Sequence, residues 1–68
     1  MTAKQFGERL RQVREAHGLT QSELAEKAGI NAMHLSHFEC GRRFPSLPNF
    51  RALCWVLKGD ICYYLFLK

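Results

Sequence analysis

The stretch from residue 19 to residue 41 contains two short helices in succession, each with its own start and stop signals. Thr20 and Glu23 form a capping box, in which the hydroxyl accepts from a first-turn amide and the carboxylate accepts from the cap amide. A helix is therefore predicted to begin at Gln21. It should end before Gly29, a residue type that adopts the left-handed backbone conformation at low cost.

The second helix of this stretch, predicted over about residues 32 to 40, repeats the pattern. Asn31 is its expected cap, and Gly41 is its expected stop. Ile30 and Leu35 occupy the two positions of a hydrophobic staple around the cap. Two helices joined by a break of about three residues cannot lie parallel, so the stretch predicts a helix-turn-helix. Such a unit can hold one helix in the major groove of DNA.

The rest of the chain predicts three more helices, so the fold class is all-α with five helices in a single domain over residues 1–68. Apolar spacing and caps indicate helices at about residues 2–17 and 47–57. A last helix should follow Asp60, and its sequence is apolar nearly all the way round. A chain of this size buries only about 60% of its surface, so the helices must pack efficiently.

The net charge of +4 is unevenly distributed, because the whole excess lies after residue 39. This asymmetry suits a polyanionic partner. The sequence has no apolar run of about 18 residues, and its polar N-terminus does not resemble a signal peptide. We therefore expect a cytoplasmic protein without a membrane partner.

The three cysteines form no pair with metal-ligand or disulfide spacing. We expect no disulfide framework and no zinc finger, with Cys54 and Cys62 packed in the core as free thiols. His34, His37 and Cys40 follow one another at three-residue steps, which raises the alternative of a metal- or redox-responsive regulator. The outer two are too far apart on one helix for an easy three-ligand site, so we expect no metal and no cofactor.

The predicted helix faces separate a buried pair of charges from an exposed surface. Arg14 falls at the edge of the apolar stripe of the first helix, and Glu39 shares the apolar face of the third. Pairing them is the economical way to bury either charge, so we predict a structural ion pair. Met33 and His37 lie on the opposite face of the third helix, flanked by His34 and Ser36.

With these elements in place, the chain resembles the phage-repressor family of helix-turn-helix domains, the Cro and Xre type, over about residues 6 to 65. The resemblance rests on FGERLRQVREAHGLTQSELAEKAG, on the E-x-G of Glu39 and Gly41, and on the P-S-L at 45–47. It implies a compact, lambda-repressor-like bundle of five helices that binds operator DNA as a homodimer.

The resemblance also implies roles for individual residues. Arg14 and Glu39 match the family's internal ion pair. DNA phosphate contacts are expected from Gln21, Asn31, Cys40, Arg42 and Arg43. DNA base contacts are expected from Ala32, Met33, His34, Ser36 and His37. The chain departs from the family at Lys58, where the family usually has glycine.

The predicted function is that of a transcriptional repressor that binds a palindromic operator in a bacterial or phage-derived, nucleoid-associated setting. A second subunit is the expected cover for the apolar last helix, with Tyr63 and Phe66 at the dimer interface. The alternative is an antitoxin-like or adaptor module whose main partner is a protein. We expect no enzyme, because the sequence has no nucleophile placed with a base and no phosphate loop. No small-molecule ligand is indicated.

Overall fold

The computed structural model describes residues 1–61, which form an all-helical structure without strands. Its helices are α1 (Ala3–Ala16), α2 (Gln21–Ala28), α3 (Ala32–Glu39) and α4 (Leu47–Val56). Each lies within one residue of its predicted limits. The described chain thus has four helices rather than five, and most of the predicted fifth falls on residues 62–68, outside the described range.

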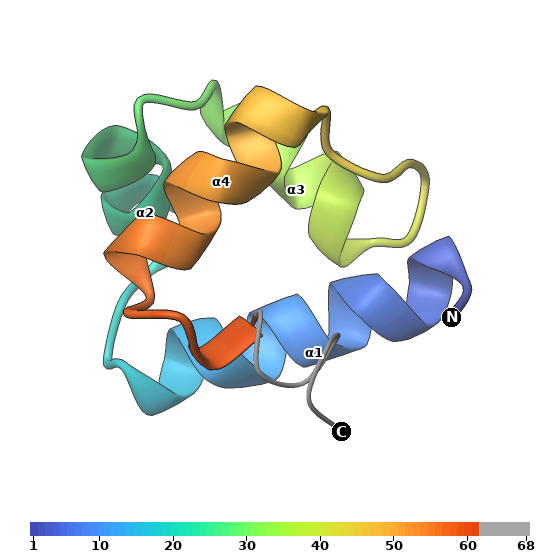
Figure 1. Cartoon of the computed structure of the whole chain (residues 1–68), viewed down its shortest axis with the longest axis horizontal. Helices are drawn as coiled ribbons and strands as arrows, with labels where there is room; N and C mark the ends of the chain where they lie inside the picture. Colours follow the sequence, from blue (N-terminus) through green and yellow to red (C-terminus); the bar gives the residue numbers. More distant parts are fainter. Residues whose placement is uncertain (62–68) are drawn as a thin grey trace.

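The helices form a small bundle in which α1 runs along one side and the other three lie beside it (Figure 1). The helix α3 packs on α1 and on α2, and α4 packs on α2. The side chains of the core are contributed by every helix, by the turn between α2 and α3, and by residues that follow α4. They are Phe6, Leu10, Val13, Leu24, Ala25, Ile30, Leu35, Phe38, Leu53, Leu57 and Ile61.

The helix starts are set by local hydrogen bonds. The Thr20 hydroxyl accepts from the Glu23 amide at 3.1 Å, and the Glu23 carboxylate accepts from the Thr20 amide at 2.8 Å. The predicted capping box of α2 is therefore confirmed. A second box, between Thr2 and Gln5, begins α1 and was not predicted.

The ends of α3 and α4 share one hydrogen-bond pattern but use different residues. At α3 the Arg42 amide donates to the His37 carbonyl at 3.0 Å, and Gly41 adopts a φ of 81°. At α4 the Gly59 amide donates to the Cys54 carbonyl at 2.8 Å, and the left-handed residue before it is Lys58, with a φ of 56°. The turn thus keeps the left-handed conformation at the position where the family usually has glycine.

Two glycines allow the end of α3 to lie directly on α1. A β-carbon on Gly7 would lie 2.4 Å from the Phe38 carbonyl oxygen and 2.6 Å from that of Glu39. A β-carbon on Gly41 would lie 2.7 Å from the α-carbon of Lys4. The backbones of α1 and α3 are therefore in close contact, with no room for a side chain between them.

Cys54 corrects one expectation about the cysteines. It lies partly buried against the core, as expected, but it is disulfide-bonded rather than a free thiol. Cys62 lies outside the described residues. Within residues 1–61, no helix is both long enough and apolar enough to cross a membrane.

Candidate nucleic-acid interface

The helix α3 presents one buried side and one exposed side. Leu35, Phe38 and Glu39 are buried, and Glu39 has a relative exposure of only 9%. Met33 on the opposite side is 66% exposed. The remaining predicted base-contact residues are Ala32 and His34, which are exposed, and Ser36 and His37, which are partly buried. An exposed helix side of this kind is what contact with base edges in a groove requires.

Asn31 caps the N-terminus of α3. Its side-chain oxygen accepts from the amides of Met33 at 2.7 Å and His34 at 3.4 Å. Asn31 is exposed, and its side-chain nitrogen is the atom that can donate to a phosphate.

A bidentate ion pair lies beneath this exposed surface. Arg14 Nε donates to Glu39 Oε2 at 2.7 Å, and Arg14 Nη2 donates to Glu39 Oε1 at 3.1 Å. Arg14 Nη1 also donates to the Leu19 carbonyl at 2.8 Å. The hydrogen bonds to Glu39 raise the pKa of Arg14 above its ordinary value, although burial opposes the shift. The structure therefore brings Arg14 and Glu39 together and ties both to the turn before α2.

Gln21, at the first position of α2, joins the same group of side chains. Its Nε2 donates to Glu39 Oε1 at 3.0 Å, and the residue is partly buried. The backbone amides of Gln21 and Ser22 precede the first hydrogen bond within the helix, so they can donate to an external anion. The start of α2 thus presents free backbone donors beside a side-chain amide that is held by Glu39.

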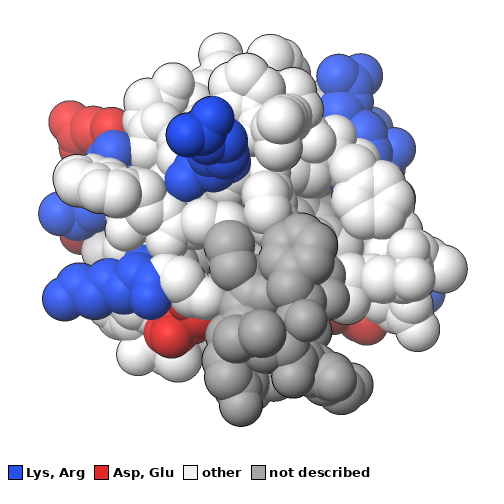
Figure 2. Space-filling model, in the orientation of Figure 1, with Lys and Arg blue, Asp and Glu red and all other residues white. Residues whose placement is uncertain are grey.

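The loop after α3 carries three of the predicted phosphate contacts. Cys40 is a free, exposed thiol, and Arg42 and Arg43 are exposed. The ring of Phe44 lies 5.7 Å from that of Phe6, which anchors the loop to α1. On the face drawn in Figure 2 the lysine and arginine side chains stand apart from one another. The candidate phosphate contacts of this loop are therefore defined by their exposure and by their place directly after α3.

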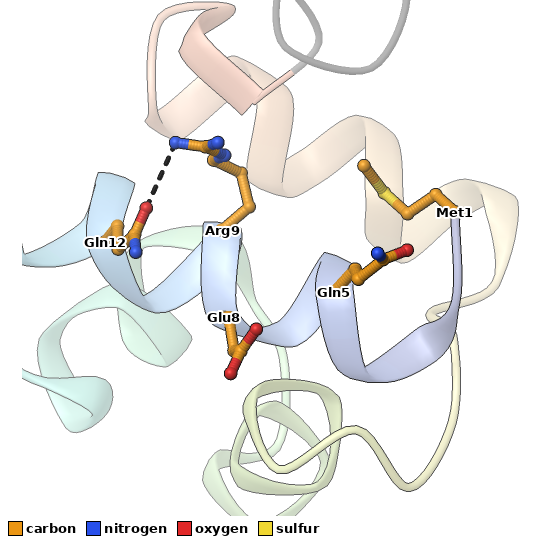
Figure 3. A pocket seen from close by; sticks show the side chains of 5 residues that line it. All are labelled: Met1, Gln5, Glu8, Arg9 and Gln12. Atoms are coloured by element: carbon orange, nitrogen blue, oxygen red, sulfur yellow. Dashed lines mark hydrogen bonds between the residues drawn. The ribbon is translucent and has the colours of Figure 1, made fainter.

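Among residues 1–61, two other candidate sites do not bring together side chains that would bind a ligand. Within residues 1–61, no three His, Cys, Asp or Glu side chains gather to hold a metal ion, so His34, His37 and Cys40 do not form a ligand set. A hollow of about 280 Å³ lies along α1 (Figure 3). Its lining residues are Met1, Gln5, Glu8, Arg9 and Gln12, and Glu8 points away from the hydrogen-bonded Arg9 and Gln12. We assign no ligand to it.

Comparison with known proteins identifies the family. A family model described as a helix-turn-helix domain matches residues 5–60. The chain belongs to the helix-turn-helix domain family. One similar solved structure is the restriction-modification controller protein C.AhdI from Aeromonas hydrophila, at 35% identity and a TM-score of 0.82, covering 88% of this chain and 91% of that one.

A second similar structure is the clp gene regulator ClgR from Corynebacterium glutamicum, at 29% identity and a TM-score of 0.85. The match covers 96% of this chain and 69% of that one. No curated protein matches the chain. The family and these two regulators indicate that this helix-turn-helix protein is a DNA-binding transcriptional regulator.

Several contacts around the site were not predicted from the sequence. The hydrogen bond from Gln21 to Glu39 is one of them. Another joins His17 Nε2 and Asp60 Oδ2 at 2.7 Å, which ties the end of α1 to the turn after α4. Both join residues far apart in the sequence, and no local pattern reveals how such segments are placed relative to one another. The predicted dimer residues Tyr63 and Phe66 lie outside the described range.

Proposed function

We propose that this helix-turn-helix protein is a cytoplasmic, sequence-specific repressor that binds a palindromic operator as a homodimer, with α3 in the major groove. The observation that carries the proposal is the exposed side of α3. It lies next to the free backbone donors at the start of α2, in a chain of this family. In this reading residues 1–68 act as one DNA-binding domain.

Phosphate contacts supply the sequence-independent part of the affinity. Arg42 and Arg43 are exposed cations on a loop that Phe44 anchors. Asn31, Cys40 and the start of α2 with Gln21 add donors to the DNA backbone. Because each neutralised phosphate releases counterions, this part of the affinity falls steeply as salt rises.

Base contacts supply the choice of sequence. Met33 and Ala32 offer apolar surface that suits thymine methyl groups. His37 and His34 carry ring nitrogens that can donate to guanine N7 or O6, and Ser36 can bond several bases.

The symmetry of the dimer determines that the operator is palindromic. A two-fold symmetric dimer places two copies of α3 about one helical turn of DNA apart, so its operator has matching half-sites. Tyr63 and Phe66 are the residues we assign to the interface, on the strength of the apolar sequence after Asp60.

Selection of bound duplexes from a random pool at two salt concentrations, followed by the mass of the complex, tests the proposal. We expect one palindromic consensus and two chains per duplex. With that duplex, His37→Ala should remove about 1–3 kcal/mol of discrimination against the wrong base. Arg42→Ala should instead weaken binding to specific and random duplexes alike and lower the salt slope by about one.

The contrary outcomes are distinct. Equal losses on specific and random duplexes for His37→Ala would remove the base-reading role of α3. Bound duplexes without a consensus, together with a complex that retains a protein partner instead of DNA, would favour the adaptor function.

A further inference from the structure

Glu39 lies where three DNA-facing parts of the molecule meet. It is the last residue of α3, and it precedes the loop with Arg42. Its carboxylate accepts a hydrogen bond from Gln21 at the start of α2. Its side chain is only 3% exposed, so it cannot itself donate to or contact the DNA backbone from the surface. Any role of Glu39 in DNA binding must act through the residues that it holds.

The ion pair makes the carboxylate a fixed acceptor. Two hydrogen bonds from Arg14 hold Glu39, and a third from Arg14 to the Leu19 carbonyl holds the guanidinium. The positive charge of Arg14 balances the negative charge of Glu39, so the carboxylate does not repel a phosphate at the nearby helix terminus. Glu39 Oε1 can therefore accept from Gln21 without opposing an anionic ligand.

The hydrogen bond also decides which atom of the Gln21 amide faces Glu39. A carboxylate only accepts, so the nitrogen and not the oxygen must face it, and that nitrogen carries a second hydrogen. A phosphate likewise only accepts, so a glutamine turned the other way would present its oxygen to the anion and repel it. Holding the side chain in one rotamer also removes part of the entropy cost of binding.

We infer that Glu39 is a positioning residue for DNA binding: it holds the Gln21 amide so that the second Nε2 hydrogen can donate to a backbone phosphate. The inference rests on the proposed DNA-binding function and adds the partner through which Gln21 acts. It differs from a purely structural role for the Arg14–Glu39 pair, because it requires that the effect of Glu39 on affinity pass through Gln21.

A double-mutant cycle measures that coupling. Wild type, Glu39→Gln, Gln21→Ala and the double variant are titrated with a short duplex of mixed sequence in low salt, at a temperature where circular dichroism shows each to be folded. Gln21→Ala should weaken binding about tenfold, as expected for one hydrogen bond to a charged group. Glu39→Gln should weaken it by a similar factor in wild type and by less than about twofold in the Gln21→Ala background. Equal losses in both backgrounds would overturn the positioning role.

A second variant keeps the test decisive if Glu39→Gln does not fold. Gln21→Asn retains an amide but is one methylene too short to reach Glu39 from the same position, and it leaves the Arg14–Glu39 pair untouched. We expect it to bind within about twofold of Gln21→Ala. Wild-type affinity for Gln21→Asn would show that an amide not held by Glu39 is sufficient, and would overturn the inference.

NMR of the side-chain amides in the absence of DNA separates this inference from the proposed function. The Gln21 amide resonances should move in the Glu39→Gln variant, recorded at a temperature where that variant is folded. Unmoved resonances would mean that the hydrogen bond does not form, whatever the protein binds. If the resonances move but the wild type binds no duplex, the proposed function and the positioning role both fail. If it binds duplex and the cycle is additive, only the positioning role fails.

Discussion

Two regions of the molecule differ in how tightly they are packed. One is the contact between α1 and the end of α3. The other is the exposed surface formed by α2, α3 and the loop that follows α3. At the contact, the backbone of α3 lies so close to Gly7 that no β-carbon fits. On the exposed surface, Met33 is 66% exposed and is not part of the packed core. The first region sets where α3 lies and the second sets what α3 can bind. Substitutions in the two regions should therefore change different measured quantities.

The largest effect is expected for Gly7→Ala. Glycine in a helix interior normally costs stability relative to alanine, so this change would stabilise an isolated helix. Here the new β-carbon would lie 2.4 Å from a backbone oxygen that no side-chain rotation can move. We expect a loss of about 3 kcal/mol, measured by urea unfolding, which is most of the stability available to a domain of this size. A neutral or stabilising result would show that α1 and α3 separate easily, and the contrast between the two regions would not hold.

Gly41→Ala should have the next largest effect, because Gly41 belongs to both regions. Its φ of 81° is strained for alanine, and its β-carbon would lie 2.7 Å from the α-carbon of Lys4. We expect a loss of about 2 kcal/mol from these two causes together. Gly29→Ala is the matched control, because Gly29 has a φ of 69° but open space around its β-carbon position. It should lose about 1 kcal/mol in the same unfolding experiment.

Equal losses at the two glycines would mean that the contact with Lys4 contributes nothing. If the contact matters, Gly41→Ala should also weaken DNA binding, since the loop with Arg42 and Arg43 begins there. Gly29→Ala should leave the affinity of the folded protein near that of wild type.

The sequence was informative where structure is local and uninformative where helices cross. The limits of α2 follow from Thr20 and Gly29, which act on their own neighbours. The approach of Arg14 to Glu39 could be inferred, because Arg14 lies at the edge of an apolar face, Glu39 lies on another, and a buried charge needs a partner. The hydrogen bond of Gln21 to Glu39 could not, because it requires the relative position of two helices.

Gly7 illustrates the same limit. In the sequence it is one glycine within a helical pattern, and only the position of the Phe38 carbonyl explains it. Lys58 gives the opposite case, since the turn keeps its left-handed conformation although the residue type does not favour it. Hydrogen bonds of the backbone, with Leu57 buried beside it, hold that turn.

The smallest effect is expected on the exposed surface, at the capping box of α2, and it should depend on pH. The Thr20 backbone amide and hydroxyl lower the pKa of Glu23 below its ordinary value. A carboxylate with a lowered pKa stabilises the folded state at neutral pH, and this contribution disappears as the pH falls through its folded pKa. Glu23→Gln, which keeps the box but removes the charge, should lower Tm slightly at neutral pH and leave it unchanged in acid.

The box at the start of α1 provides the comparison within the same molecule. Thr2 and Gln5 make the same two hydrogen bonds as Thr20 and Glu23, but Gln5 carries no charge to titrate. The effect of Gln5→Ala on Tm should therefore be the same at neutral and at acid pH. Thermal unfolding of both variants at the two pH values separates the charge of the box from its hydrogen bonds. If the Glu23→Gln difference persisted in acid, it would not come from the charge of Glu23, and the contrast with the uncharged box of α1 would not hold.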